Sequence, residues 1–402
     1  MAGGSQRARS WPEVSYEERP WTGDPDIPRR WRSAYAGPYR AAVVPRIARL
    51  DPALATDVAA LVAEASTEIA RFDAEMGADI APFASLLLRS ESAASSQIEN
   101  LTASATAVAL AEMGDTSRRN ATQIVGNTRA MRAAIGLADR LDEQAIIDMH
   151  AALLDSHDAA TGRYRSEQVW IGTSSYGPHT ASFVPPHHTR VAAAITDLVE
   201  FMRRDDVPAL LQAAVAHAQF ETIHPFPDGN GRTGRALVHS LLRSKGLTRQ
   251  VTVPVSAGLL SNVEAYFASL DAYRQGDVGP IAQRFAEAGY DAVVSGKTLV
   301  ADLRVIRASW AGALHARPQA VVWRALDVVL RQPVFDSPFL RRELGVSTPG
   351  ADASIAQLVE IGAVRQVTDG RRNRRYAAPA ILHALDAFAD RAGRRRAGSR
   401  SS

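Results

Sequence analysis

The 402-residue sequence contains no cysteine, and no apolar run in it approaches the length of a membrane-spanning helix. Without cysteine the protein cannot build a disulfide framework, a thiol nucleophile or a zinc site with cysteine ligands, and its composition fits a reducing compartment. A spanning helix needs about 20 apolar residues, and no apolar core follows the arginines of the N-terminus. The sequence therefore predicts a cytoplasmic protein with neither a membrane span nor a secretory signal.

An excess of charge of one sign is also lacking. The chain has 46 Lys and Arg against 43 Asp and Glu, a formal net charge of +3, which is too small to indicate nucleic-acid binding by itself. Hydrophobic residues make up 46% of the chain and charged residues 22%. These proportions and the length predict a globular protein of two or three domains.

Residues 224–235 concentrate the side chains that can do chemistry, in the sequence HPFPDGNGRTGR. The preceding segment, residues 209–223, is apolar on nearly every face and predicts a buried helix. Pro225 and Pro227 prevent that helix from continuing. His224 therefore lies at the end of a rigid element, and its ordinary pKa near ~6.5 suits a general base at neutral pH.

The middle of this stretch can bind an anion. Gly229, Asn230 and Gly231 let the backbone turn sharply and leave N–H groups free to face a ligand. A helix over residues 233–245 would add its positive N-terminal end to the same place.

The charged residues of the stretch suit a polyphosphate and its metal. Asp228 offers a hard oxygen to Mg²⁺, whose other positions phosphate and water would fill. Arg232 and Arg235 lie three residues apart on one helical turn, so both can bind phosphate oxygens as rigid forks. The alternative is a loop cap whose arginines are solvated at the surface.

The segment resembles the Fic family motif, His-x-Phe-x-Asp/Glu-Gly-Asn-Gly-Arg-x-x-Arg, at every constrained position. The resemblance covers roughly residues 39–296 and implies a nucleotidyltransferase, a protein adenylyltransferase that moves AMP from ATP to a Ser, Thr or Tyr hydroxyl of a protein, itself included. It also implies, as an alternative, an enzyme that removes AMP. A further alternative is a winged-helix DNA-binding regulator that uses the Fic domain only as a nucleotide sensor.

The resemblance assigns a role to each motif residue. His224 would deprotonate the target hydroxyl, and Asp228 would hold Mg²⁺ on the α- and β-phosphates. The α-phosphate site would be lined by Gly229, Asn230 and Gly231. Arg232 would hold the β-phosphate and Arg235 the γ-phosphate.

A second pattern lies upstream of the motif. Residues 95–100, SSQIEN, match the family's inhibitory pattern Ser/Thr-x-x-x-Glu-Gly/Asn, with Ser95, Glu99 and Asn100 at its constrained positions. In the family this glutamate pairs with the second motif arginine, here Arg235, and so occupies the fork meant for the γ-phosphate. The alternative is a surface carboxylate at the end of a helix.

Two β-prone runs around a polar turn, near residues 169–172 and 181–186, predict a hairpin. The resemblance assigns this hairpin to a flap that docks the target backbone, with Val169, Trp170, Ile171 and Gly172 on its first strand. The alternative is a structural hairpin. The resemblance also makes Tyr266 and Tyr273 candidates for the adenine pocket, although their spacing of seven equally fits a helix face that packs inward.

The C-terminal part predicts a winged helix-turn-helix domain. Helices over residues 319–331, 337–344 and 351–361 precede a hairpin over residues 363–376. Four arginines lie on the proposed wing, namely Arg371, Arg372, Arg374 and Arg375. They could contact a nucleic-acid backbone, but the predicted recognition helix carries no Lys or Arg, so protein docking or dimerisation is an equal alternative.

The predicted architecture is mainly α: a Fic-type helical bundle with a β-hairpin flap, followed by the winged helix-turn-helix domain. Within it, residues 53–72 and 81–98 predict helices. The expected parts are an extended arm (1–36), a helical region with the inhibitory pattern (37–106), the catalytic domain (107–300), the winged domain (318–390) and a disordered basic tail (391–402). A homodimer is one candidate assembly.

Overall fold

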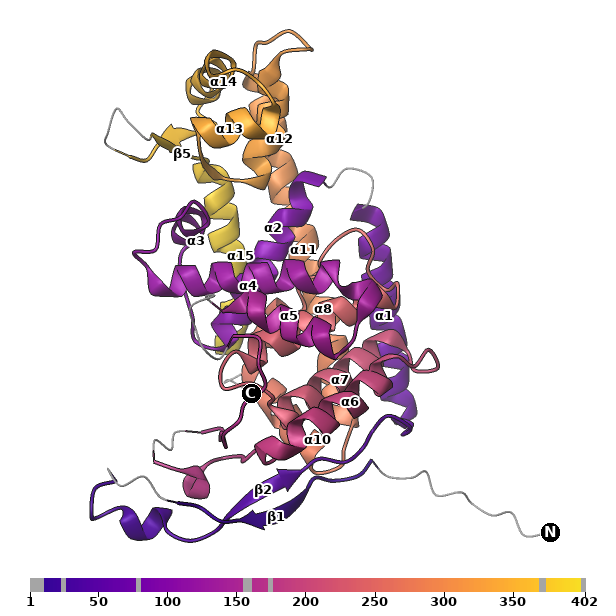
Figure 1. Ribbon diagram of the computed structural model, residues 1–402. Coiled ribbons are helices and arrows are strands. Elements are labelled where there is room, and N and C mark those ends of the chain that lie inside the picture. The colour runs from indigo at the N-terminus through magenta and orange to yellow at the C-terminus, as the bar shows by residue number, and fades with distance from the viewer. Residues whose placement is uncertain are drawn as a thin grey trace, which may run out of the picture. The chain divides into compact units, whose positions relative to one another are not determined.

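The computed structural model describes residues 11–22, 27–76, 81–154, 161–172, 176–368 and 374–398. The chain is mainly helical with small sheets (Figure 1). It divides into two compact units. Unit 1 comprises Met1–Ser66, Ala130–Leu247 and Glu264–Ala286, and unit 2 comprises Thr67–Arg129, Thr248–Val263 and Glu287–Ser402. The units are therefore discontinuous in sequence, whereas the sequence predicts consecutive domains. In the described segments no helix has the length and apolar character that crossing a membrane requires.

Unit 1 holds the motif stretch, residues 224–235, at the junction of two packed helices. Its elements, including those that begin or end at its boundaries, are β1 (Ser15–Arg19), η1 (Arg32–Tyr35), β2 (Tyr39–Val43), α1 (Thr56–Met76), η2 (Ala138–Arg140), α5 (Glu143–Leu153), η3 (Pro178–Thr180), η4 (His188–Arg190), α6 (Val191–Met202), α7 (Ala209–Ile223), α8 (Asn230–Ser244) and α10 (Val263–Arg274). The predicted helix over residues 209–223 is confirmed as α7, and every residue from Leu210 to Ile223 is buried.

Helix α8 packs closely on α7 because a glycine faces it. A Cβ at Gly234 would lie 2.9 Å from a ring carbon of Phe220 and 3.0 Å from Glu221 Oε1. Helix α8 also begins at Asn230, three residues before the predicted start. Gly229 is therefore its N-cap, and Asn230 and Gly231 form its first turn rather than a loop.

The predicted extended arm and the start of the predicted helical region are wrong in part, because β1 and β2 form an antiparallel hairpin. The hairpin is anchored by aromatic side chains that the arm carries. Trp11 packs on Tyr273 at 5.8 Å between ring centroids, and Trp21 packs edge-on against Tyr39 at 5.7 Å. Trp31 differs, since 48% of it is exposed.

Unit 2 is built around α2, whose predicted bounds are confirmed. Its elements are α2 (Ala81–Ile98), α3 (Ala105–Glu112), α4 (Arg119–Gly136), α9 (Val255–Ser261), α11 (Gly279–Ala313), α12 (Val321–Arg331), β3 (Val334–Asp336), α13 (Ser337–Leu344), α14 (Thr348–Glu360), β4 (Arg365–Gln366), β5 (Arg375–Ala377) and α15 (Pro379–Gly398). Helices α1, α4, α10 and α11 cross the unit boundaries, and α11 runs past the predicted end of the catalytic domain at residue 300.

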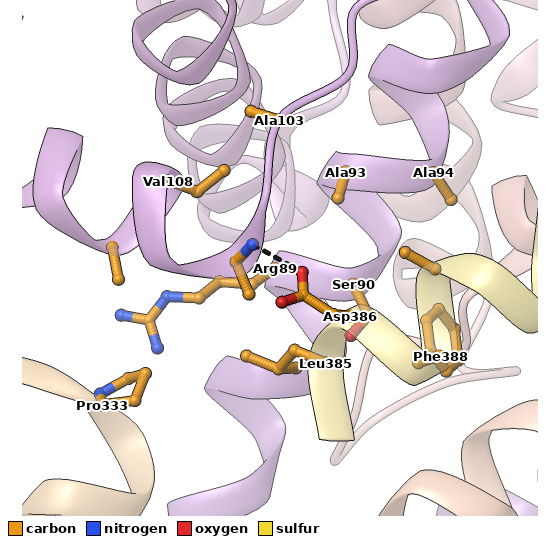
Figure 2. Close-up of a pocket in the computed structure, with 13 residues that line it drawn as sticks. Arg89, Ser90, Ala93, Ala94, Ala103, Val108, Pro333, Leu385, Asp386 and Phe388 are labelled. Carbon is orange, nitrogen blue, oxygen red and sulfur yellow. Dashed lines mark hydrogen bonds between the residues drawn. The ribbon is translucent and has the colours of Figure 1, made fainter. Parts of the chain in front are cut away.

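Buried polar side chains organise this unit. Glu91 accepts hydrogen bonds from the N–H (2.9 Å) and the hydroxyl of Ser256 at the start of α9. Arg89 forms an ion pair with Glu112 at 2.8 Å, and both side chains are less than a tenth exposed. Asp386 on α15 accepts the N–H of Ala105 at the start of α3 (2.7 Å), beside a cavity of about 50 Å³ (Figure 2).

The C-terminal elements follow the order helix, strand, helix, helix, strand, strand, and the three strands form an antiparallel sheet in the order β3-β5-β4. Helix α13 has its predicted bounds, and α14 begins three residues before its predicted start because Ser347 caps it. The predicted disordered tail is wrong up to residue 398, because α15 continues to Gly398. Residues 399–402 lie outside the described residues.

Candidate functional site

The site is built on the C-terminal end of α7. His224 is the C-cap of this helix and adopts a left-handed conformation (φ 50°, ψ 62°), one of two non-glycine residues with positive φ among the described residues. Its N–H donates to the Phe220 carbonyl at 2.8 Å. A left-handed non-glycine residue costs roughly 1 kcal/mol and persists where the surroundings impose it. The strain lies at the residue that the sequence predicts as the base.

The imidazole of His224 is a neutral base at physiological pH. Although its side chain keeps 20% of its surface exposed, burial lowers its pKa from 6.5 to about 3, with the cations of Arg165 and Arg274 acting in the same direction. Nδ1 is buried and forms no hydrogen bond within the described residues, and the nearest carboxylate oxygen, Glu221 Oε2, is 3.9 Å away. The neutral ring has one nitrogen that can accept a proton, but the lowered pKa makes it a weaker base than the value near ~6.5 on which the sequence prediction rests.

Asn230 closes the loop between the two helices. Its Oδ1 accepts the Phe226 N–H and its Nδ2 donates to the Phe226 carbonyl, both at 2.8 Å. Only 2% of Asn230 is exposed. Its side chain therefore has a structural task, which leaves the backbone N–H groups of the first turn of α8 to face a ligand.

His150 on α5 contacts the same loop. Its Nδ1 accepts the Gly162 N–H (3.3 Å), so Nε2 carries the proton that is donated to the Asp228 carbonyl (3.1 Å). The ring stacks on Phe226 with centroids 3.7 Å apart and planes 1° from parallel. The side chain of His150 is fully buried, and its contact with the motif is a feature that its position in the sequence did not signal.

The charged motif residues fit a metal-bound polyphosphate. Asp228 has 73% of its side chain exposed, and its Oδ2 lies 3.4 Å from the Arg232 guanidinium, a loose contact that a ligand can replace. Arg232 is only 5% exposed, and within the described residues its Nε has no hydrogen-bond partner. Arg235 is 2% exposed. An orphaned buried guanidinium N–H beside an exposed carboxylate suits an anion accompanied by a hard cation.

Arg165 is the residue that the sequence interpretation missed. It is 4% exposed, and its Nε donates to the His224 carbonyl at 2.9 Å. Burial lowers its pKa to about 10. An arginine in an irregular segment carries no pattern in a single sequence, so only its contacts identify it.

The predicted hairpin is reduced to one antiparallel bridge between Ile171 and Phe183, with hydrogen bonds of 2.8 Å and 3.2 Å. Val169 and Trp170 precede the bridge and Gly172 follows it, while residues 173–175 lie outside the described residues. Residues 181–186, which we call the return segment, pair with the N-terminal hairpin, since the Ala42 N–H donates to the Val184 carbonyl at 3.0 Å.

Tyr266 and Tyr273 lie inside unit 1, each 1% exposed. The Tyr266 hydroxyl pairs with His217 at 2.8 Å, and the Tyr273 hydroxyl donates to Gln219 at 2.9 Å. Both partners lie on α7. This placement agrees with the alternative of a helix face that packs inward, and adenine contact stays a prediction.

The inhibitory pattern forms the C-terminal end of α2 in unit 2. Ser95 is fully buried, and Glu99 and Asn100 form the turn after the helix. Asn100 has φ 61°, and the Leu101 N–H donates back to the Ser96 carbonyl at 3.0 Å. The pattern therefore has Gly or Asn at this position for a backbone reason, because these residues tolerate a left-handed C-cap best.

The wing arginines fall only partly within the described residues. Arg371 and Arg372 lie outside them, Arg374 is exposed, and Arg375 is half-buried and donates to the Met113 carbonyl at 3.3 Å. Of the four predicted phosphate contacts, Arg375 therefore already has a structural partner.

Comparisons with known proteins show similarity over the part of the chain that contains the motif. Residues 140–242 match the model of the Fic/DOC family. Protein adenylyltransferase fic-1 of Caenorhabditis elegans is 29% identical over 153 residues, which cover 37% of this chain and 27% of that protein. Probable protein adenylyltransferase aq_aa38 of Aquifex aeolicus is 32% identical over 108 residues, which cover 27% of this chain and 31% of that protein. The match thus spans less than a third of the length of these two relatives.

A solved structure agrees at the level of the fold. A Fic family protein from Desulfovibrio desulfuricans G20 aligns with a TM-score of 0.52 at 24% identity, over 81% of this chain and 97% of that chain. Residues 140–242 of this chain are thus similar to the Fic/DOC family, and parts of the chain are distantly similar to protein adenylyltransferases.

Proposed function

We propose that the protein transfers AMP from ATP to a serine, threonine or tyrosine hydroxyl of a protein. The observation that carries this proposal is a neutral imidazole, His224, at the end of α7, followed directly by Asp228, the first turn of α8 and the buried Arg232, which together would form an anion cradle. Binding a nucleotide needs the cradle but no base beside it. The relatedness to protein adenylyltransferases supports the same class of reaction.

His224 would take the proton of the target hydroxyl on Nε2, because Nδ1 is buried. The hydroxyl oxygen then forms a bond to the α-phosphorus, and the bond from that phosphorus to the bridging oxygen breaks. Pyrophosphate leaves with the electron pair of the broken bond. Phosphate charge beside the ring would raise the low pKa of His224, which favours the proton transfer.

The cradle would hold the nucleotide by charge and backbone N–H groups. Asp228 would bind Mg²⁺, which supplies neutralisation of the α- and β-phosphates when bound. The N–H groups of Gly229, Asn230 and Gly231 would surround the α-phosphate. Arg232 would bind the β-phosphate and Arg235 the γ-phosphate. Since these groups are fixed before substrate binds, they stabilise the developing charge without reorganising.

We further propose that Glu99 switches the enzyme off. The match of Ser95, Glu99 and Asn100 to the inhibitory pattern supports this role, as does the left-handed Asn100, which ends α2 directly after the glutamate. A Glu99 carboxylate on Arg235 would occupy the fork meant for the γ-phosphate and repel the incoming phosphates.

The C-terminal elements would form a winged helix-turn-helix module that selects or places the target. Their order and the three-stranded antiparallel sheet support this assignment. Helix α14, in the position of a recognition helix, carries Asp352 and Glu360 and no Lys or Arg. Its charge favours a protein partner over the phosphate backbone of nucleic acid. The flap segment, residues 169–172, would dock the target backbone in extended form.

Incorporation of α-labelled ATP with Mg²⁺ into the purified protein tests the proposal without knowledge of the natural target. We expect label to rise up to about 100-fold in Glu99→Gly and in the isosteric Glu99→Gln, because a switch that keeps about 99% of molecules inhibited can release no more than that. Label should disappear when Glu99→Gly is combined with His224→Ala.

The matched control combines Glu99→Gly with His383→Ala, which changes an exposed histidine of α15. This variant should label like Glu99→Gly alone. Absence of label in every variant, with ATP still bound in calorimetry, would contradict AMP transfer and favour AMP removal or nucleotide sensing. Loss of ATP binding in His224→Ala would show that the histidine is structural.

A further inference from the structure

Arg165 is a buried cation whose acceptors are all backbone carbonyls. Besides the His224 carbonyl, its guanidinium donates to Glu167 (3.1 Å), Pro186 and Ile223 (3.4 Å). Its own backbone N–H donates to the Pro225 carbonyl at 2.9 Å. One residue therefore binds three successive carbonyls at the end of α7, at residues 223–225.

These contacts meet where the backbone is strained. His224 has a left-handed conformation and precedes a proline, and a proline restricts the backbone of the residue before it. Such a conformation persists only when the surroundings over-determine it. The planar fork of an arginine can bind several carbonyls at fixed angles, which an ammonium group cannot do.

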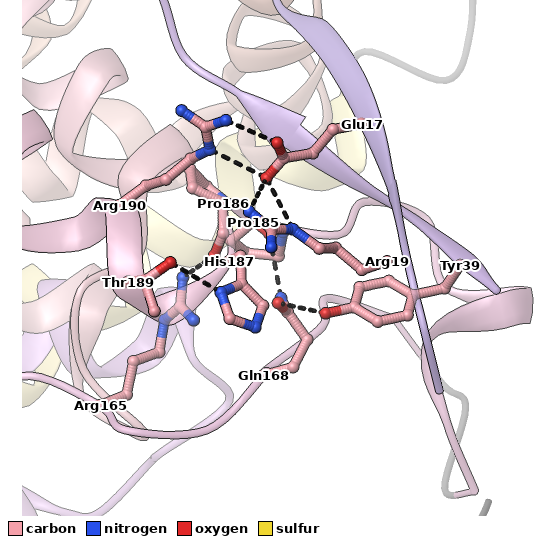
Figure 3. Close-up of polar contacts among 10 residues, drawn as sticks. All are labelled: Glu17, Arg19, Tyr39, Arg165, Gln168, Pro185, Pro186, His187, Thr189 and Arg190. Carbon is pink, nitrogen blue, oxygen red and sulfur yellow. Dashed lines mark hydrogen bonds and ion pairs between the residues drawn. The ribbon is translucent and has the colours of Figure 1, made fainter. Parts of the chain in front are cut away.

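Arg165 also connects the catalytic turn to the return segment of the predicted flap. Figure 3 shows Arg165 beside Pro186, and Gln168 bound to the Pro185 carbonyl (3.0 Å) and to the Tyr39 hydroxyl (2.9 Å). Tyr39 belongs to β2 of the N-terminal hairpin. A continuous set of hydrogen bonds thus joins the hairpin, the return segment and the turn at His224.

We propose that Arg165 is a positioning residue, which holds the backbone of His224 in its left-handed conformation and so aims the imidazole at the target hydroxyl. This inference rests on the proposed AMP transfer. Within the described residues the Arg165 guanidinium donates to backbone carbonyls alone, so it would touch no reacting atom. A displacement of the base by about 1 Å can cost about 100-fold in rate, so the fixed turn has a direct effect on catalysis.

The charge of Arg165 should affect the titration of His224, and this titration can be measured without AMP transfer. The charged groups around the imidazole are Arg165, Arg274 on α10, Glu221 on α7 and Asp228 in the loop. The two cations disfavour the imidazolium form, and so removing one of them should raise the pKa of His224.

The test compares Arg165→Lys and Arg165→Gln in the Glu99→Gly protein. We expect Arg165→Lys, which keeps the charge and loses the fork, to lower kcat about 100-fold with the KM for ATP changed less than about threefold. Arg165→Gln should lower kcat at least as much. In histidine-labelled full-length protein, NMR titration should show the His224 midpoint raised by about one unit in Arg165→Gln and unchanged in Arg165→Lys.

Arg204→Lys is the matched control, because Arg204 also donates to a backbone carbonyl, that of Leu50, but at the C-terminal end of α6. It should leave kcat and the His224 titration unchanged. A wild-type kcat in Arg165→Lys overturns the positioning role, as does an unchanged midpoint in Arg165→Gln. If the Glu99→Gly parent transfers no AMP, the proposed function fails instead, and the chemical shifts and titration of His224 in the Arg165 variants then decide whether Arg165 sets the conformation of this residue.

Discussion

The double hydrogen bond between Asn230 and Phe226 should determine whether the loop of the site stays closed. Asn230→Ala removes both 2.8 Å bonds and leaves the Phe226 N–H and carbonyl without partners in a residue that is 0% exposed. A buried polar group left unsatisfied costs about 1–3 kcal/mol, so the closed loop should lose at least about 2 kcal/mol. The same change should weaken ATP binding, because Asn230 begins the helix that faces the phosphates.

Hydrogen exchange at the Phe226 amide measures this loss locally. If the amide exchanges through opening of the loop, a loss of about 2 kcal/mol makes exchange about 30-fold faster. Asn230→Asp keeps the shape and the acceptor but turns an oxygen toward the Phe226 carbonyl, so it should accelerate exchange as well. Mass spectrometry of a peptide that spans residues 224–232 gives the rate in native buffer.

Asn120→Ala is the matched control, since the Asn120 side chain donates one 3.1 Å hydrogen bond to the Thr102 carbonyl at the surface. It should change the exchange of residues 224–232 by less than about twofold, because an exposed hydrogen bond contributes little. Unchanged exchange in both Asn230 variants would refute the reasoning that this side chain closes the loop.

Three further predictions concern stability and can be measured by urea unfolding. Gly229→Ala should lower the free energy of unfolding by about 2–4 kcal/mol, since φ is 77° and the new Cβ would lie 2.7 Å from a leucine methyl carbon. The control Gly345→Ala has φ 65° but open space around the new Cβ, so it should lower the free energy of unfolding by only about 1 kcal/mol. His217 and His224 each have a pKa of about 3 in the folded protein, below the unfolded value near 6.5, so unfolding takes up protons. The free energy of unfolding should therefore fall as the pH drops from 6.5 toward 3. At pH 5 the loss should be at most about 2 kcal/mol per histidine. A pH-independent midpoint over this range would contradict that sign. Asp73→Ala should lower the free energy of unfolding by about 2–5 kcal/mol, because the Asp73 carboxylate accepts hydrogen bonds from three backbone N–H groups at 2.8–2.9 Å. A variant as stable as the wild type would mean that water replaces the carboxylate.

Helices with strong local signals were predicted well from the sequence. Helix α7 is apolar on all faces and is followed by prolines, and both of its ends are as predicted. Helices α2 and α13 also have their predicted bounds. The start of α8 was predicted three residues late, because the signal that decides it is the contact of Asn230 with Phe226 across the turn. Glycine and asparagine favour turns by propensity alone, and this tertiary contact overrides that preference.

The N-terminal hairpin shows a different limit of sequence reasoning. The strands at residues 15–19 and 39–43 are short and are separated by residues 20–38, so neither predicts its partner. The same holds for the disordered tail predicted from residue 391. Helix α15 extends to Gly398, and Ala392 near its end is buried. A basic composition indicates that a segment is exposed to water. Whether the segment is helical also depends on the packing of its apolar residues against the rest of the protein, which composition does not show.

The sequence by itself determined the chemistry of the site, because His224, Asp228 and Arg232 lie within nine residues and their spacing follows from one helix end and one turn. Only the tertiary structure decided what holds them. His150 stacks on Phe226, and Arg165 binds the carbonyl of His224, from segments 59 or more residues away along the chain. Which distant segments contact the site depends on how whole helices pack together, and no local sequence pattern specifies that packing.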